Sequence, residues 1–281
     1  MFTLTDAAHG LLIDRGYHVV MELSPAWYDA IAARTSQRRY EPRPIPDEIA
    51  SRLRSFDTAG PPPPNARVVI VDGETDRLFT GVLGSYGAVE GAPLAAAFLG
   101  REEHEGDVGY LGEAFILEAT SLGLGTCWIA GSFDKERTGG LVALESGERV
   151  MALTPVGTPV ERRPRGERLL RRAVGASKRL SLDKLAPGID DPSSGESRWP
   201  AWARTAVAAA RLAPSGANRQ PWRFRYDGRG LVLTQAAKLY WTAPLDFGIA
   251  RLHMELGAAR EGVRGTWEEL AEPDVARFVA E

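Results

Sequence analysis

The sequence predicts an α+β fold, an α/β sandwich in which helices pack on a mixed β-sheet. Stretches with a helical spacing of apolar residues alternate with short apolar runs rich in β-branched residues, a pattern typical of helices packed on a sheet. A stretch near residue 107 also recurs later in the chain, which indicates two related parts. The 281 residues, 44% hydrophobic and 25% charged, suffice to bury a large core.

The first part of the chain contains both kinds of element. Ser24 and Pro25 supply an N-cap and a first helical residue, and Gly123 ends the longest helix. In "RVVIVDG" a β-branched run closes at an Asp-Gly turn, as strands often do. We expect helices at 24–33, from residue 46 onward and at 107–123, and strands at 67–73, 93–99, 126–131 and 149–157.

A change of composition divides the chain near residue 190. Residues 161–179 are strongly basic, and we expect most of them to form a solvated face. The Pro, Gly and Ser residues that follow are typical of a linker, and an alanine-rich helix comes next. We therefore predict a first unit at 1–185, a linker at 186–198 and a second unit at 199–281.

The two units share an internal repeat at an offset of 139 residues. Six of 22 ungapped positions are identical, where unrelated sequence would give about one or two. Two copies of one unit can fold as the covalent version of a two-fold dimer, because each copy keeps its self-complementary surface. The matched residues are Asp107, Gly109, Leu117, Ala119, Gly123 and Trp128 with Asp246, Gly248, Leu256, Ala258, Gly262 and Trp267.

Charge and composition exclude several classes of protein. The net charge of −3 has no basic bias, so we expect no nucleic-acid partner. No apolar run reaches the length of about 18 residues that a membrane span needs, and Asp6 and Asp14 interrupt a start that does not resemble a signal peptide. A single cysteine, Cys127, excludes an internal disulfide and fits a reducing compartment. We expect a cytoplasmic protein without a membrane partner.

Polar residues alternate in "RTSQR", at the end of the first predicted helix. Arg34, Ser36 and Arg38 lie two positions apart, so one extended stretch can aim two guanidiniums and a hydroxyl the same way. The guanidinium fork suits a phosphate. A solvated helix end with cations near its negative pole explains the same residues, and from this motif alone that explanation comes first.

Turn-forming residues crowd the segment "PSGANRQPW" at 214–222. Ser215 and Asn218 can bond local backbone groups, and Gly216 can take a positive φ, so a structural turn is one explanation. A turn needs only two or three such residues, and this segment has six before Trp222. The surplus indicates amide and hydroxyl groups directed at a ligand.

Glycines bracket the apolar segment "GLGTCWIAG" at 123–131. Gly125 and Gly131 would let a flat ligand approach backbone N–H groups. We expect Cys127 to be a small core residue, since no histidine stands in an evident pairing position. The four histidines lack metal-ligand spacing, so no metal site is predicted: His9, His18, His104 and His253.

Together these segments resemble the nitroreductase superfamily of FMN-dependent oxidoreductases. The matching elements over about residues 25–270 are "RTSQR", "EATSLGLGTCWIAG", "TPVGTP", "SKRLSLDKL" and "LAPSGANRQPW". In ordinary members the PS-x-x-N-x-QPW motif follows the arginine motif by some tens of residues, and two chains pair around each flavin. Here Pro214 comes about 180 residues after Arg34. The chain is similar to the branch with two fused halves, a pseudo-dimer in which the second half lacks an arginine motif of its own.

The resemblance implies a set of FMN contacts. Arg34 and Ser36, with Thr35 between them, would contact the phosphate and ribityl chain, and Arg38 would face the N1/O2 edge of the ring. Family members often carry Glu where Ala130 stands, so that carboxylate is missing here. The other implied contacts are Trp128, Ile129, Ala130 and Gly131 near N5, Lys178 and Arg179 at the phosphate, and Pro214, Ser215, Gly216 and Asn218 over the ring.

The resemblance also implies a reaction. NAD(P)H would deliver hydride to flavin N5, and a small aromatic acceptor such as a nitroaromatic or a quinone would then take the electrons, with no catalytic side chain required. A flavin storage or sensing protein, or a degenerate scaffold without flavin, stays open as an alternative, as does another flavin reaction such as dehalogenation or flavin fragmentation. We expect a monomer that acts as a pseudo-dimer, with a homodimer left open.

Overall fold

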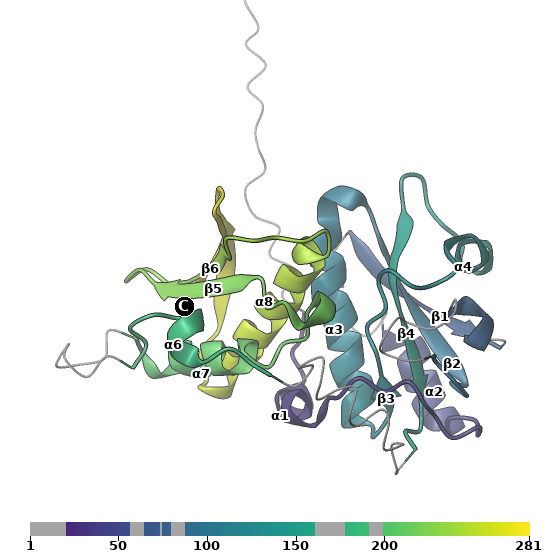
Figure 1. Cartoon of the computed structure of the whole chain (residues 1–281). Coiled ribbons are helices and arrows are strands. Elements are labelled where there is room, and N and C mark those ends of the chain that lie inside the picture. The colour runs from purple at the N-terminus through teal and green to yellow at the C-terminus, as the bar shows by residue number, and fades with distance from the viewer. Residues whose placement is uncertain (1–20, 57–64, 74, 80–87, 161–177, 191–198) are drawn as a thin grey trace, which may run out of the picture.

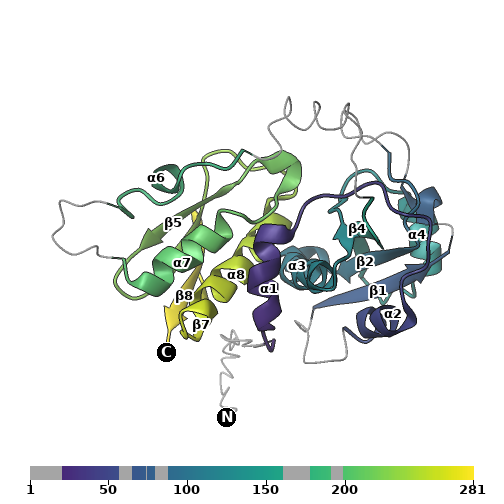
Figure 2. The same cartoon turned by 90° about the horizontal axis from the view of Figure 1, so that it is seen from below.

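A computed structural model of the chain describes residues 21–56, 65–73, 75–79, 88–160, 178–190 and 199–281. Its strands form two separate four-stranded sheets, which lie at opposite ends of the molecule (Figures 1 and 2). Helices fill the space between the sheets, so the fold is α+β, as the sequence predicts. Most of the basic stretch, residues 161–177, and most of the predicted linker, residues 191–198, lie outside the described residues.

The two sheets have the same strand order. The first has the order β1-β2-β4-β3 and the second β5-β6-β8-β7, and the neighbouring strands pair antiparallel throughout. The two sheets therefore share one topology, although their strands differ in length. The strands are β1 (Ala66–Asp72), β2 (Leu94–Gly100), β3 (Gly125–Thr126), β4 (Arg149–Gly157), β5 (Trp222–Tyr226), β6 (Leu231–Gln235), β7 (Gly265–Glu269) and β8 (Asp274–Ala280).

Two long helices lie between the sheets, α3 (Glu105–Ser121) and α8 (Ala243–Arg260), and they pack against each other (Figure 2). Each occupies the same place in its half, after the second strand and before the third. Most residues of both helices are buried, as expected of helices enclosed from several directions. The remaining α-helices are α1 (Pro25–Ala33), α2 (Asp47–Arg54), α4 (Lys135–Leu141), α6 (Leu182–Leu185) and α7 (Ala201–Ala210).

Glycines bring α3 and α8 into close contact. A Cβ atom at Gly109 would overlap the carbonyl oxygen of Leu245, and one at Gly248 would overlap the carbonyl oxygen of Gly106. Both residues of the first contact stand 139 positions from their counterparts in the second (109 to 248 and 106 to 245). The contact is therefore reciprocal, as in an interface between two identical subunits.

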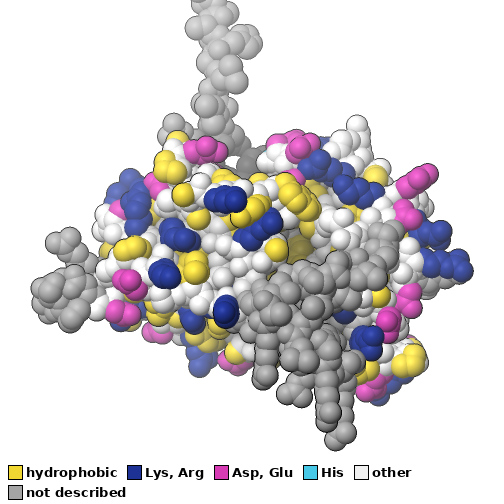
Figure 3. Space-filling view, in the orientation of Figure 1, with side chains coloured by type: hydrophobic (Ala, Val, Ile, Leu, Met, Phe, Trp, Pro, Cys, Tyr) yellow, Lys and Arg dark blue, Asp and Glu magenta, His cyan; other side chains and the backbone are white. Residues whose placement is uncertain are grey.

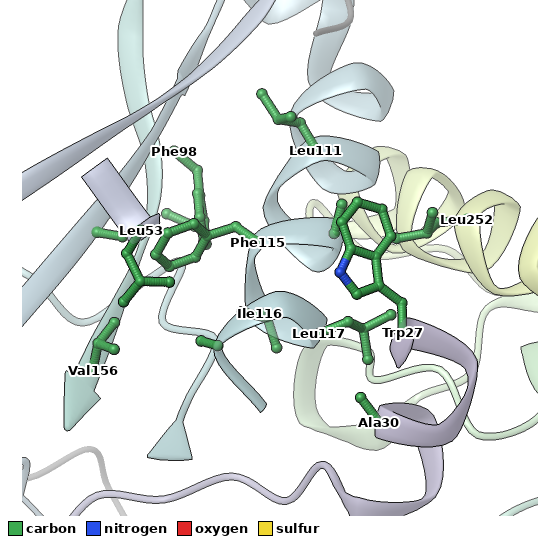
Figure 4. Close-up of a cluster of buried hydrophobic side chains, with 14 of the residues drawn as sticks. Trp27, Ala30, Leu53, Phe98, Leu111, Phe115, Ile116, Leu117, Val156 and Leu252 are labelled. Atoms are coloured by element: carbon green, nitrogen blue, oxygen red, sulfur yellow. The ribbon is translucent and has the colours of Figure 1, made fainter. Parts of the chain in front are cut away.

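The hydrophobic core runs across both halves. In the cluster of Figure 4, Phe98 of the first sheet packs on Phe115 of α3, with 6.0 Å between the ring centres. Trp27 of α1 and Leu252 of α8 belong to the same cluster. A second cluster under the second sheet is centred on Trp222. Because α8 contributes to both clusters, the two halves share a core.

Most predicted elements are confirmed, but two predictions are wrong. The predicted mixed sheet is instead a pair of antiparallel sheets, because the period of a strand does not specify the direction of its partner. Of the strand predicted at 126–131, only Thr126 lies in a ladder, and Ile129 makes one isolated bridge to Leu153. Trp128 instead turns its indole N–H to Glu113 of α3.

The boundary between the units stays a prediction. Ala186 and Ile189, at the start of the predicted linker, are buried in the second cluster together with Leu185 of α6. This packing favours a boundary before α6 rather than after it.

Among the described residues, no helix combines the length and the apolarity that a bilayer span requires.

Candidate functional site

The first motif, 34–38, lies beside the short strand β3. Ser36 pairs with Thr126 in a parallel bridge, and the backbone N–H of Gln37 donates to the Thr126 carbonyl over 2.7 Å. Arg38 continues this course, because its carbonyl accepts from the N–H of Glu90 over 2.8 Å. The extended course that the alternating residues predict is therefore confirmed, and it places the motif against the Gly-rich segment at 123–131.

Glu113 is the centre of a buried polar network between the halves. Its carboxylate accepts from the indole Nε1 of Trp128 over 2.7 Å and lies 3.7 Å from the guanidinium Nε of Arg34. The Nε2 atom of His253, on α8, lies 2.9 Å away. Glu113 and His253 are fully buried, and the Arg34 side chain is 7% exposed. Four segments of the chain thus meet at one carboxylate.

The second ring nitrogen of His253 defines where a proton sits. Nδ1 lies 3.1 Å from the carbonyl oxygen of Ala209, which can only accept, so Nδ1 carries a hydrogen. Nε2 faces the Glu113 carboxylate, so His253 joins α8 to α3 through a buried polar contact.

The motif at 214–222 is bound to the late basic pair. The side-chain amide of Asn218 donates to the carbonyl of Lys178 over 2.8 Å, and its oxygen accepts from Arg179. A second guanidinium nitrogen of Arg179 donates to the Leu212 carbonyl over 2.9 Å, and Gln220 accepts from the N–H of Leu180 over 2.8 Å. These bonds join the two predicted segments into one surface.

Arg179 links this surface to the first motif. The pKa of Arg179 is lowered to about 10, mainly by burial, then by the positive charge of Arg34 and to a smaller extent by that of Arg211. The negative charge of Glu113 acts in the opposite direction. Arg34 and Arg179 are thus held near each other although their charges repel. The Nε atom of Arg34 is buried and makes no hydrogen bond to the described residues.

This donor set fits a phosphate group. Glu113 is one carboxylate facing two guanidiniums, so an anionic ligand would balance the second positive charge, and both guanidiniums can present paired N–H donors to phosphate oxygens. In Figure 3, Lys and Arg side chains border a recessed apolar patch near the middle of the face that is seen. Within the described ranges, no group of three His, Cys, Asp or Glu side chains is placed to hold a metal ion.

The turn at 214–222 differs from the prediction in one respect. Gly216 does not take a positive φ, but Ala217, Asn218 and Gln220 do, at 49°, 57° and 48°. Gly216 is required for space, since a Cβ atom there would overlap the hydroxyl of Thr242. Non-glycine residues in the left-handed region cost free energy, and such strain is often found at ligand sites.

Asp246 anchors this turn from the first turn of α8. It accepts from the N–H of Gly216 over 3.0 Å and from the Thr242 hydroxyl over 3.2 Å. Burial raises the pKa of Asp246 from 3.8 to about 7, against the opposing effects of Gly216, Thr242 and the charge of Arg219. The backbone N–H of Gln220 donates to the Ser215 hydroxyl over 2.9 Å in a partly buried bond that closes the same loop.

The predicted N5-side segment, 128–131, ends against the second half. A Cβ atom at Gly131 would lie 3.2 Å from the indole of Trp241. Cys127, next to this segment, is a buried free cysteine, as predicted. Thr35 accepts from the Gln37 amide over 3.4 Å, Pro214 is buried, and Ile129 and Ala130 pack in the cores.

The structure reveals four residues that the sequence does not single out as site residues: Glu113, Trp241, Asp246 and His253. Asp246 is one of the repeated positions, which could have pointed to it. Glu113 interrupts an otherwise apolar helix face, a weaker signal. Nothing in the local sequence of His253 or Trp241 distinguishes them from ordinary core or surface residues.

A protein family described as "Putative TM nitroreductase" matches residues 26–258, which is most of this chain. A Thermotoga maritima protein described as a "putative nitroreductase" has a similar crystal structure, with a TM-score of 0.59 and 20% identity over 95% of this chain and 97% of that chain. This likeness shows that the two chains share a fold. No curated protein matches the sequence.

Two further solved structures match about half of the chain. A nitroreductase family protein from Clostridium novyi covers 48% of this chain and 86% of its own, with 21% identity and a TM-score of 0.41. A nitroreductase with bound FMN from Bacteroides fragilis covers 49% of this chain and 90% of its own, with 16% identity and a TM-score of 0.39.

Proposed function

Because the chain belongs to the family described as "Putative TM nitroreductase", and is thus a nitroreductase-like oxidoreductase, we propose that it is FMN-dependent and oxidises NAD(P)H. The observation that carries the proposal is the approach of Arg34 and Arg179, two cations whose charges repel in a partly buried place. A bound phosphate monoester relieves this repulsion. FMN carries such a phosphate and, when bound, accepts hydride and passes electrons on.

The residues of the first half hold the phosphate end in this proposal. Arg34 donates to the phosphate from a position that its ion pair with Glu113 maintains at 3.7 Å. Thr35 and Ser36 supply hydroxyls to the phosphate and ribityl chain, and Arg38 supplies positive charge to the polar edge of the ring. Trp128, Ile129, Ala130 and Gly131 form the backbone wall of the site.

The residues of the second half complete the site. Arg179 adds the second guanidinium, and Lys178 adds charge next to it. Asn218 is oriented by its 2.8 Å bond to the Lys178 carbonyl, and Asp246 holds the N–H of Gly216. The strained turn that begins at Pro214 and Ser215 is thereby fixed before a ligand arrives, which reduces the entropy lost on binding.

We further propose that the chain is a fused pseudo-dimer with one such site. The identical strand orders of the two sheets and the reciprocal contact of Gly109 and Gly248 support it. The arginine motif comes from one half and the PSGANRQPW turn from the other. The second half has no Arg-x-Ser-x-Arg segment, so a second site would lack its phosphate ligands. A cytoplasmic location and a monomeric state stay predictions.

FMN retention tests the proposal. Protein incubated with FMN and desalted should show the flavin absorption bands, and R34A and R179A should lose them. R229A is the matched control, because Arg229 is 68% exposed and pairs with Glu268 in the second sheet. Colourless wild-type protein would contradict the proposal. Flavin-loaded protein that oxidises no NADH or NADPH with menadione or nitrofurazone would indicate storage or sensing instead.

A further inference from the structure

Trp241 is the most exposed large hydrophobic side chain in the described part of the chain, with 66% of its surface accessible. Leu239, two residues earlier, is 40% exposed. Burial of an indole is favourable, so a ligand that covers Trp241 gains free energy from the contact.

The exposure of Trp241 does not come from a loose segment. On one side, the guanidinium of Arg219 stacks on the Tyr240 ring at 3.4 Å from its centre. On the other side, Thr242 is buried and its hydroxyl donates to Asp246 over 3.2 Å. Trp241 is therefore held between two anchored neighbours and kept facing solvent.

The position of Trp241 places it at the candidate site. Two atoms of its indole lie 3.2 and 3.5 Å from where a Cβ of Gly131 would be. Gly131 ends the backbone wall of the first half, and Thr242 lies against Gly216 of the second-half turn. Trp241 thus borders both motif segments at once.

We propose that Trp241 is the wall of an acceptor subsite that takes planar aromatic molecules by stacking. The flat indole face favours a ring laid against it. The cationic groups of Arg219 and Lys238 lie 3.4 and 5.6 Å from the Tyr240 ring, one residue away, so positive charge borders the apolar face. The subsite therefore suits aromatic acceptors with electron-rich oxygens, such as quinones and nitroaromatics, and this inference rests on the proposed function.

Steady-state kinetics of FMN-loaded protein test the subsite. Two acceptors are compared with NADH as donor: menadione, which is planar and aromatic, and ferricyanide, which has no ring to stack. W241A should raise the KM for menadione by about threefold to tenfold, the loss expected for one aromatic contact, and leave the KM for ferricyanide within about twofold. W241F should restore most of the menadione KM, because phenylalanine keeps a flat ring.

L141A is the matched control, since Leu141 is also a strongly exposed apolar residue, at 57%, on α4 of the first half. It should leave both KM values unchanged. Equal menadione KM values for W241A and the wild type would overturn the inference while the proposed function stands. If the menadione KM of W241A is unchanged but its apparent mass on size exclusion differs from that of the wild type, the inference is also overturned. Trp241 would then belong to a contact between protein chains. Wild-type protein that takes up no FMN would overturn the proposed function and this inference with it.

Discussion

The two halves of the molecule use the same aspartate position in different ways. Asp107 and Asp246 stand 139 residues apart, each in the first turn of a central helix. Asp107 is 37% exposed and accepts from the side chain of Asn65, just before β1, over 3.2 Å. Asp246 is 4% exposed and holds the N–H of Gly216, just before β5. One repeated residue thus anchors an ordinary surface contact in one half and the strained motif turn in the other.

In the pseudo-dimer that we propose, this difference shows how two halves with one strand order can carry a single site. The strand orders and the glycine contact between α3 and α8 are shared by both halves. The halves differ in their connecting segments, where α4 lies between β3 and β4 but no helix lies between β7 and β8, and in a few buried polar side chains. Each of the following predictions compares a residue in one half with its counterpart or analogue in the other.

The largest effect is expected at Glu113. Trp128 and Trp267, a repeated pair, each donate an indole N–H to a glutamate, Glu113 or Glu255. Glu113 also pairs with the buried guanidinium of Arg34, so E113Q should lower the free energy of unfolding by about 3–5 kcal/mol. E255Q, whose partners are the neutral Trp267 and Tyr110, should cost about 1 kcal/mol. Urea unfolding measures both, and equal losses would show that Glu113 has no special role.

The next effect is a pH dependence at Asp246. Its pKa is about 7 in the folded protein against 3.8 ordinarily, so between these values the folded state binds more protons than the unfolded chain. Stability should therefore fall as pH rises from about 4 to about 7. D246N should remove this slope and raise stability at pH 8 by at most about 4 kcal/mol.

D107N is the comparison for Asp246. It removes the exposed counterpart and leaves Asp246 in place, so the slope between pH 4 and 7 should persist in thermal unfolding. A slope that survives in D246N would assign the pH dependence to another group.

The reciprocal glycine contact predicts two similar, smaller losses. G109A and G248A each force a methyl group against a backbone carbonyl, and overpacking of this kind costs about 1–3 kcal/mol. G140A in α4 is the control, because its added methyl would meet no atom within 4 Å. If the losses in the free energy of unfolding differ strongly between G109A and G248A, the contact between the central helices is not symmetric.

The smallest stability effect is expected at Asn65. N65A removes one partly exposed bond to Asp107 and should cost at most about 1 kcal/mol, with no effect on FMN uptake. N218A, in the corresponding loop of the second half, should abolish FMN retention, because Asn218 orients Lys178 and Arg179. Desalting after FMN incubation and absorption spectroscopy distinguish the two variants.

The sequence determined the local elements and the chemistry of the motifs. The strands β1, β2 and β4 and the helices α1, α3 and α7 follow from period, from Pro25 at the start of α1 and from Gly123 after α3, signals that act within a few residues. The repeat, read from Asp107 and Gly109, anticipated that α3 and α8 are counterparts. The donor groups of Arg34 and Asn218 are the same in any fold, so the sequence alone predicts both residues as candidate ligand contacts.

Only the tertiary structure decided how these pieces meet. Glu113 and His253 are 140 residues apart, and the contact of Gly131 with Trp241 spans 110 positions (241 − 131). Two antiparallel sheets formed where one mixed sheet was predicted. The physical reason is the same in each case: periodicity and propensity record which face of an element is buried, whereas the partner it is buried against depends on packing between residues far apart in the chain.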